Sequence, residues 1–210
     1  MPFNLIIKIK LMFILGVDIG LYHMGLVGCE VFPDFTLKSV EFCELVDITD
    51  FNCKNPEGIK GCVLFHEKCI ADYMSHFFQN YEGIFDKSEY VIIERQPPMG
   101  LVAVQELILF KYRSKSVMVS PNSMHAYNDI GHLGYDDRKE MTIKLTTHNL
   151  KKFEYFNKLS RKHDISDALL IVKYFLSKKN KEYIRIKELE EWRTRNQTFI
   201  KNINAYAYTP

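Results

Sequence analysis

The stretch FILGVDIG, residues 13–20, decides how this 210-residue chain is organised. It is an apolar run too short for a typical helix, and it ends in a carboxylate, Asp18, and a glycine, Gly20. This pattern is typical of a strand that is buried on both faces. Asp18 would then leave the core at the end of the strand, where Gly20 lets backbone or ligand approach closely. Taken alone, Asp18 is equally well explained as a turn residue.

Two later stretches repeat the combination of an apolar element with acids at one end. YVIIERQPP, residues 90–98, predicts a second buried strand that ends at Glu94. HDISDALL, residues 163–170, opens an apolar-periodic helix in which Asp164 and Asp167 share one side of the first turn. Acids at a helix start also serve capping and the helix dipole. In a sheet covered by helices, however, ligands gather outside the carboxyl ends of strands, so these acids can meet at one point.

Clustered carboxylates point to a particular chemistry. Unpaired carboxylates that lie close together repel one another and raise each other's pKa. Hard divalent cations relieve this repulsion, and oxygen ligands of this kind suit Mg²⁺ or Mn²⁺. The spacing of the acids therefore predicts a divalent metal site.

Three motifs in this order, Val17–Gly20, Ile93–Gln96 and His163–Ala168, resemble those of the RuvC-type Holliday-junction resolvases. The most similar branch is found in poxviruses and other large DNA viruses, with the mitochondrial resolvases nearby. Val119–Pro121 and Tyr135–Lys139 also resemble the viral branch, and the match spans roughly residues 13–176. Each motif is weak alone, whereas the ordered set is specific.

The resemblance implies an α/β fold in which an RNase H-like, RuvC-type mixed five-stranded sheet is flanked by helices. It implies a Mg²⁺-dependent endodeoxyribonuclease that resolves four-way DNA junctions by paired symmetric nicks, using two ions per site, with Mn²⁺ as the alternative. Asp18 would bridge the two ions. The implied metal ligands, which are also catalytic, are Asp18, Glu94, Asp164 and Asp167. Lys139 would act with them, and Lys139 and Gln96 would position the scissile phosphate. A homodimer is implied because a four-way junction presents paired symmetric strands.

This chain departs from the viral pattern at three places. His23 stands where viral relatives usually carry Asn, and Pro97–Met99 stands where they often carry a basic residue. Their last motif often has two adjacent acids, where this chain has His163 and Asp164. These departures bear on DNA contacts and on His163, whose role the sequence leaves open between proton transfer and a supporting position beside the metal.

Composition is typical of a single globular domain, with 47% apolar and 26% charged residues. Net charge is only +2, so nucleic-acid binding would depend on local basic clusters. No run approaches the roughly 18 apolar residues that a membrane span needs. We interpret Leu5–Leu15 as a strand extension, or as an upstream extension with Met12 as an alternative start, rather than a secretory signal.

Cysteine spacing favours free thiols in a reducing compartment, because it matches no metal finger or CxxC motif. The five cysteines are Cys29, Cys43, Cys53, Cys62 and Cys69. We therefore expect an intracellular protein, in the host-cell cytoplasm if it is viral and otherwise in the mitochondrion.

Between the motifs, patterning predicts further elements. Strands are expected over residues 21–32, 35–46 and 116–119, and helices over 62–78, 101–112 and from 137 onward. The stretches 52–61 and 122–136 are expected as loops, and 83–88 as a connection. A buried stripe at helical spacing is predicted for Ile165, Ala168, Leu169, Val172, Phe175 and Leu176.

Basic residues supply candidate DNA contacts. A cluster at the end of the 101–112 helix either contacts phosphate or complements the helix dipole; its members are Lys111, Arg113 and Lys115. Arg138 and Lys139 can reach a phosphate from a helix start. Residues 138–162 hold eight basic residues against two acids, a local charge of +6, and include Lys151 and Lys152. The interleaved Phe153, Tyr155 and Phe156 suit stacking on exposed bases, but core or dimer packing is favoured for them.

The carboxyl-terminal part differs from the rest of the chain. We divide the chain into a resolvase domain over residues 1–179 and a basic, helical tail over residues 180–210. Residues 173–201 hold nine basic residues against four acids, a local charge of +5. Such a tail can track a DNA arm, form a solvated face or bind a partner.

Other functions fit the same acids less well. Sugar-kinase and chaperone ATPases with an RNase H-like core need a second phosphate loop and a much longer chain. A broader branched-DNA or RNA–DNA hybrid nuclease would use the same carboxylates and is the closest alternative. A non-catalytic junction-binding module is disfavoured by the intact set of four acids.

Overall fold

The computed structural model describes residues 10–50, 67 and 69–207, with side chains described up to residue 197. The strands are β1 Met12–Asp18, β2 Met24–Val31, β3 Leu37–Val46, β4 Tyr90–Glu94 and β5 Ser116–Val119. The helices are α1 Ile70–Lys87, α2 Val102–Tyr112, α3 Pro121–Tyr127, α4 Tyr135–Leu150, α5 Glu154–Lys158 and α6 His163–Ala207. Four predictions fall wholly or partly outside the described residues: the 52–61 loop, residues 5–9 of the amino-terminal extension, residues 62–66 and 68 of the 62–78 helix, and the thiols of Cys53 and Cys62.

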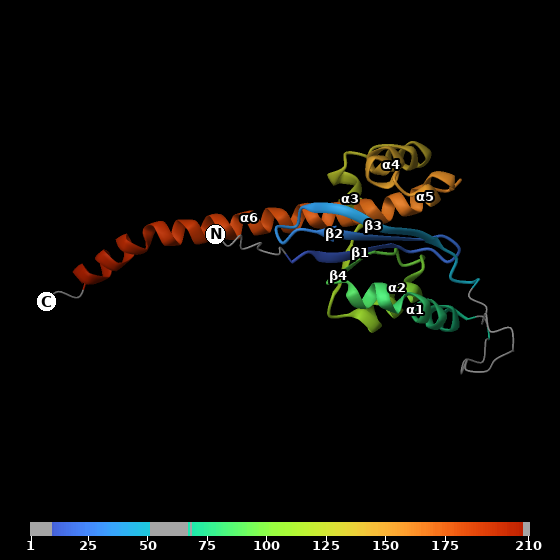
Figure 1. Ribbon diagram of the computed structural model, residues 1–210, viewed down its shortest axis with the longest axis horizontal. Coiled ribbons are helices and arrows are strands. Elements are labelled where there is room, and N and C mark those ends of the chain that lie inside the picture. Colours follow the sequence, from blue (N-terminus) through green and yellow to red (C-terminus); the bar gives the residue numbers. More distant parts are fainter. Residues whose placement is uncertain (1–9, 51–66, 68, 208–210) are drawn as a thin grey trace, which may run out of the picture.

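A single mixed sheet organises the molecule. Its strand order is β3-β2-β1-β4-β5. Strand β2 pairs antiparallel with both β1 and β3. Strand β4 pairs parallel with both β1 and β5. Helices α1 and α2 cover one face, and α6 covers the other with α3, α4 and α5 outside it (Figure 1). The predicted five-stranded mixed sheet flanked by helices is confirmed.

Side chains of the central strands alternate between two cores. In β1, Ile14 packs in the core on the α6 side, and Leu15 and Val17 pack in the core on the α1/α2 side. In β4, Ile92 faces α6, and Val91 and Ile93 face the other way. A strand buried on both faces has no need for polar residues until it ends, which explains the continuous apolar runs in the sequence.

Helix α6 lies unusually close to the sheet because β1 and β2 present glycines beneath it. A Cβ at Gly16 would stand 2.4 Å from the carbonyl oxygen of Ala168, and one at Gly25 would stand 2.2 Å from that of Asp164. Both separations are far below van der Waals contact, so only glycine allows this approach. The first turns of α6, which carry the predicted acids, are thereby held against the strand ends.

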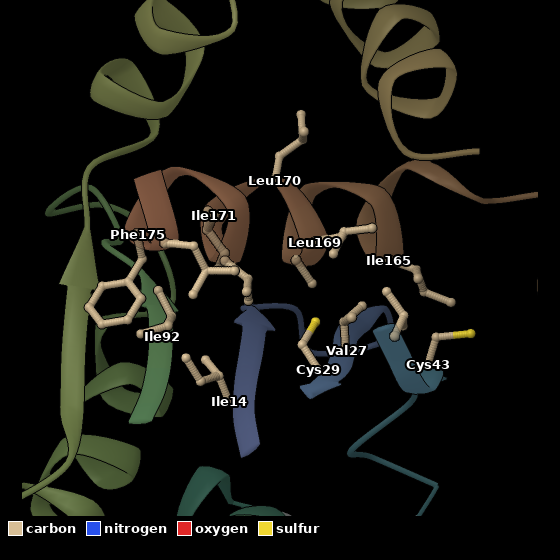
Figure 2. Packing of buried hydrophobic residues seen from close by; sticks show 14 of the residues in the cluster. Ile14, Val27, Cys29, Cys43, Ile92, Ile165, Leu169, Leu170, Ile171 and Phe175 are labelled. Atoms are coloured by element: carbon tan, nitrogen blue, oxygen red, sulfur yellow. The ribbon is translucent and has the colours of Figure 1, made fainter. Parts of the chain in front are cut away.

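The predicted stripe on α6 is confirmed, since all six of its residues are buried in the core on that side of the sheet. Figure 2 shows Phe175 directed toward the strands, whereas Leu170 points away from them. Leu170 and Ile171 are also buried, because α3 and α4 pack on the outer side of α6. The helix is therefore apolar over most of its circumference in this part.

Several sequence-based boundaries were wrong. Helix α1 continues through Gly83 to Lys87, where a connection was expected, because Phe85 is fully buried and anchors its last turns. The expected loop at 122–136 contains α3, which Pro121 starts and the buried Met124 fastens to the core. Strand β3 has an imperfect alternation because its pairing with β2 shifts register twice, at Gly28/Cys29 and at Glu30/Val31.

The carboxyl-terminal part is continuous with the domain. The boundary expected at residue 180 falls inside α6, a helix of 45 residues that projects well beyond the sheet (Figure 1). None of the helices in the described ranges combines the length and apolarity that crossing a bilayer would require. The thiols of Cys29, Cys43 and Cys69 are free, and burial raises the pKa of Cys29 to about 12, which keeps it protonated.

Candidate active site

Strand register brings Asp18 and Glu94 side by side. Strands β1 and β4 are parallel with Val17 opposite Ile93, so the next residues, Asp18 and Glu94, end two neighbouring strands at the same edge. Asp18 lies four residues after Ile14, and Glu94 lies two after Ile92. Because side chains alternate along a strand, both acids lie on the face that packs against α6.

Helix α6 delivers the other two acids to this edge. Asp18 pairs with Gly25 of β2, and the backbone of Asp164 lies directly over Gly25. Asp167 follows one turn later, next to Ala168, which packs on Gly16. The structure thus brings together all four acids predicted from the sequence.

Burial raises the pKa values of three of these carboxyls, and repulsion by neighbouring acids adds to the shift of two of them. Asp18 is half-buried, and its pKa lies well above the usual value because of burial first, then because of the charges of Glu94 and Asp167. Burial also raises the pKa of Glu94, although hydrogen bonds from Asp18 and Gln96 oppose this. Burial and the charge of Glu94 raise the pKa of Asp167 to about 7. The hydrogen bond between the two carboxyls raises the pKa of Asp18 and lowers that of Glu94, so Asp18 is the donor of the pair when it is protonated.

Two glutamines hold Glu94 in place. The side-chain amide of Gln96 donates to Glu94 Oε2 over 3.2 Å, and its oxygen accepts from the backbone N–H of Leu101. The buried Gln105 accepts from the backbone N–H of Gln96 over 2.8 Å. Gln96, predicted to contact the scissile phosphate, therefore has both ends of its amide engaged within the protein.

Thr142 of α4 supports Asp167 and was not found from the sequence. It is buried, and its hydroxyl can donate either to Asp167 or to the carbonyl of Arg138, which is 2.9 Å away. The single hydroxyl proton serves one of these partners at a time. The sequence signals for these two residues are weak. Thr142 is a polar residue on the packed side of α4, and Gln105 is a polar residue in the mostly apolar helix α2.

Asp164 differs from the other acids because it already has a cationic partner. Arg161 Nε donates to Asp164 Oδ2 over 2.6 Å, and an Nη nitrogen donates to Oδ1 over 3.2 Å. His163 Nε2 lies 3.3 Å from Oδ1 and 2.7 Å from the ammonium of Lys139. Burial lowers the pKa of His163, which favours a neutral ring that accepts from Lys139. Lys139, predicted to be catalytic, thus stands beside the acids.

The donor set suits a hard divalent cation. Buried carboxylates that repel one another bind such a cation with a gain in stability, because the cation replaces the missing countercharge. Within residues 10–50, 67 and 69–197, no three His, Cys, Asp or Glu side chains are already arranged as a finished metal centre.

The predicted basic residues fall into separate places. The start of β5 pairs with the start of β4, so Lys111, Arg113 and Lys115 lie at the sheet edge opposite the acids. Lys111 pairs with Glu82 over 3.2 Å, and Lys115 donates to the carbonyl of Phe85 over 2.7 Å. The structure does not bring these three together with the carboxylates.

Helix α4 carries the remaining basic candidates. Arg138 and Lys139 lie in its first turns near the acids, whereas Lys151 and Lys152 follow its other end, about 18 Å further along. Lys152 lies 3.8 Å from Glu41 of β3. Phe156 is buried and Phe153 packs against the same core, so core packing, the favoured prediction, is confirmed for these two aromatics. Tyr155 is exposed instead, so core packing was wrong for it.

Comparisons with known proteins give structural relatives only. No sequence model of a protein family matches the chain, and no curated protein matches it significantly. The fowlpox virus resolvase, solved in complex with its substrate Holliday junction DNA, superposes with a TM-score of 0.58 at 14% identity, covering 80% of this chain and 98% of the viral one. The same viral resolvase solved on its own gives a TM-score of 0.51 at 15% identity, covering 80% of this chain and 99% of that one.

A second relative comes from a eukaryote. The yeast mitochondrial Holliday junction resolvase superposes with a TM-score of 0.54 at 17% identity, covering 89% of this chain and 85% of that one. Both relatives are of the kinds that the sequence motifs indicate. The chain therefore has the RuvC-type, RNase H-like fold of the Holliday junction resolvases.

Proposed function

We propose that this protein is a metal-dependent endodeoxyribonuclease that resolves four-way DNA junctions by paired symmetric nicks. The observation that carries the proposal is the convergence of Asp18, Glu94 and Asp167: burial raises the pKa values of all three, and the charges of neighbouring acids raise those of Asp18 and Asp167 further. Strongly perturbed carboxyls at the carboxyl edge of a sheet are typical of a catalytic site rather than of a surface. The fold shared with junction resolvases supports DNA junctions as the substrate.

The residues that would hold the metal are the four acids Asp18, Glu94, Asp164 and Asp167. Asp18 is central because it contacts Glu94 and because the charges of both acids on α6 raise its pKa. Bound Mg²⁺ or Mn²⁺, in a pair, supplies activation of water and stabilisation of the leaving oxygen in phosphodiester hydrolysis. The chain's own residues set the geometry: Gln96, which Gln105 holds in turn, fixes Glu94, and the Thr142 hydroxyl can donate to Asp167. Burial of the strand ends excludes bulk water from behind the carboxylates.

Lys139 is the cation best placed to meet a scissile phosphate. Its ammonium is held 2.7 Å from His163 Nε2 and 4.3 Å from the centre of the Tyr135 ring. A half-buried lysine positioned in this way presents a fixed positive charge at the mouth of the acidic site. His163 acts as the acceptor that orients Lys139.

A homodimer is part of the proposal. Two copies related by a two-fold axis would present two equivalent sites to the paired strands of a junction. Single subunits that act independently would not couple the two nicks. Sedimentation of the active species at the mass of a monomer would remove this element and leave the nuclease proposal standing.

Cleavage of a substrate panel tests the proposal. A synthetic four-way junction, a linear duplex and an RNA–DNA hybrid are incubated with the full-length protein and Mg²⁺, and the nicks are mapped on each strand. Paired nicks at symmetric positions in the junction, with the duplex intact, are the expected result. Preferred cleavage of the hybrid would keep the metal site and refute junctions as the substrate. Junction binding by folded protein with no cleavage in Mg²⁺ or Mn²⁺ would refute the enzyme.

A further inference from the structure

Asp164 is the one acid of the four whose charge is already compensated. Arg161 contacts both of its carboxylate oxygens, over 2.6 and 3.2 Å, and only 10% of the Asp164 side chain is exposed. Asp18, Glu94 and Asp167 instead interact chiefly with one another. Arg161 precedes α6 by two residues, so the pair closes a short loop at the helix start.

A guanidinium and a divalent cation cannot both use the same carboxylate oxygens. Their positive charges repel at such short range, and the lone pairs that accept from Nε and Nη are those that a metal would take. In the metal-free, DNA-free protein, Arg161 therefore competes directly with any ion for Asp164. The other three acids face no such competitor among the contacts described.

Arg161 also has access to a second anion. Its side chain is 42% exposed, and it stands at the same sheet edge as Lys139 and the carboxylates. A planar guanidinium binds a phosphodiester with the same two-pronged geometry that it uses for a carboxylate. A DNA backbone arriving at the site thus offers Arg161 an alternative to Asp164.

We propose that Arg161 acts as a latch: without DNA, its guanidinium occupies the Asp164 carboxylate and keeps a metal ion from binding there. A DNA phosphate then releases Asp164 by replacing it as the partner of the guanidinium. The proposal rests on the metal-dependent nuclease function argued above. Because linkage is reciprocal, DNA binding must tighten metal binding by the same factor by which metal binding tightens DNA binding. The complete set of metal ligands is then assembled only on DNA, and Arg161 is a positioning residue for Asp164.

Metal affinity without DNA tests the latch directly. Mn²⁺ is titrated calorimetrically into the full-length wild type, Arg161→Gln and Lys162→Gln. Lys162→Gln is the matched control, because it also removes a positive charge next to Arg161. The Lys162 ammonium lies over the Phe156 ring rather than on an acid. Arg161→Gln should bind Mn²⁺ roughly fivefold more tightly than Lys162→Gln, as expected for release of one partly exposed bidentate pair. Structural damage would weaken binding instead of tightening it.

A second measurement tests the coupling. Affinity for a labelled four-way junction is measured without divalent ions and with Ca²⁺. Addition of Ca²⁺ should tighten junction binding by the wild type more than by Arg161→Gln, in which Asp164 is already released. Equal Mn²⁺ affinities of the two variants, or equal Ca²⁺ effects in wild type and Arg161→Gln, would overturn the latch alone. Failure of the wild type to bind any divalent ion would overturn the proposed function and the latch with it.

Discussion

At the scale of single residues, the site gathers acids at a place where burial disfavours their charged forms and internal hydrogen bonds offset this only in part. The pKa values of Asp18, Glu94 and Asp167 are raised, which means that the folded protein binds protons more tightly than the unfolded chain. Stability then falls as pH rises through the window between the unfolded and folded pKa values. For Asp167 this window runs from about 4 to about 7. A bound divalent cation acts in the opposite direction, because it favours the ionised carboxylates.

This linkage gives a prediction for metal-free protein. In the presence of a chelator, the free energy of unfolding of the wild type, relative to that of Asp18→Asn, should fall by a few kcal/mol between about pH 5 and about pH 8. Asp18→Asn removes one buried charge and relieves its neighbours, so it should be the more stable protein at the higher pH. Urea denaturation across this range measures the difference. A constant difference between the two proteins would show that the acids do not repel one another in solution.

The residues that support the acids could not be predicted from the sequence. The acids could be predicted because each ends an apolar run, and because strand alternation and register then force Asp18 and Glu94 together. Gln105, Thr142 and Arg161 belong to segments whose position depends on tertiary packing. Their side chains acquire a role only once α2, α4 and the start of α6 are placed around the strand ends.

At the scale of elements, the close contact between α6 and the strands fixes the geometry of the site. Gly16 and Gly25 allow the helix backbone to approach, and this contact sets how far Asp164 and Asp167 stand from Asp18. The apolar stripe of α6 predicted which face would be buried. It did not predict burial on the outer side as well, because that depends on α3 and α4. The location of α3 in an expected loop was missed because seven residues carry too little periodicity.

A substitution in β2 tests the role of this contact. Gly25→Ala introduces a Cβ 2.2 Å from the Asp164 carbonyl oxygen, so the start of α6 must move. We expect a loss of roughly 1–3 kcal/mol in the free energy of unfolding, together with weaker metal binding. Gly83→Ala is the matched control: its Cβ meets nothing within 4 Å inside α1, and it should stabilise the protein by about 0.5–1 kcal/mol. Gly25→Ala with unchanged stability would contradict the close packing.

At the scale of the whole molecule, a compact domain carries a long projecting helix. Asn180 makes a side-chain contact with the body, donating to the carbonyl of Asp34 over 2.6 Å. Further along α6, Ile184, Ile186, Leu189 and Trp192 are each about half exposed. The sequence predicted a basic, helical segment here. It gave no reason to expect that α6 would run without a break from the active site into this segment.

Truncation after Tyr183 tests how independent the domain is. Because the removed side chains through residue 197 are exposed, apart from the half-buried Asn196, the melting temperature of the remaining domain should change by less than about 2 °C. Circular dichroism should lose helical signal in proportion to the residues removed. A large fall in melting temperature would mean that the projecting part of α6 packs on the domain or on a second copy in solution.

The central claim is that the four converging acids form the metal site of a junction-cleaving nuclease. The most direct measurement is Mg²⁺-dependent cleavage and binding of a four-way junction by the wild type, Asp18→Asn and the exposed-carboxylate control Asp129→Asn. We predict that Asp18→Asn loses cleavage by at least about a hundredfold while its junction affinity stays within a few-fold of the wild type, and that Asp129→Asn cleaves normally. Substantial cleavage by Asp18→Asn would contradict the account.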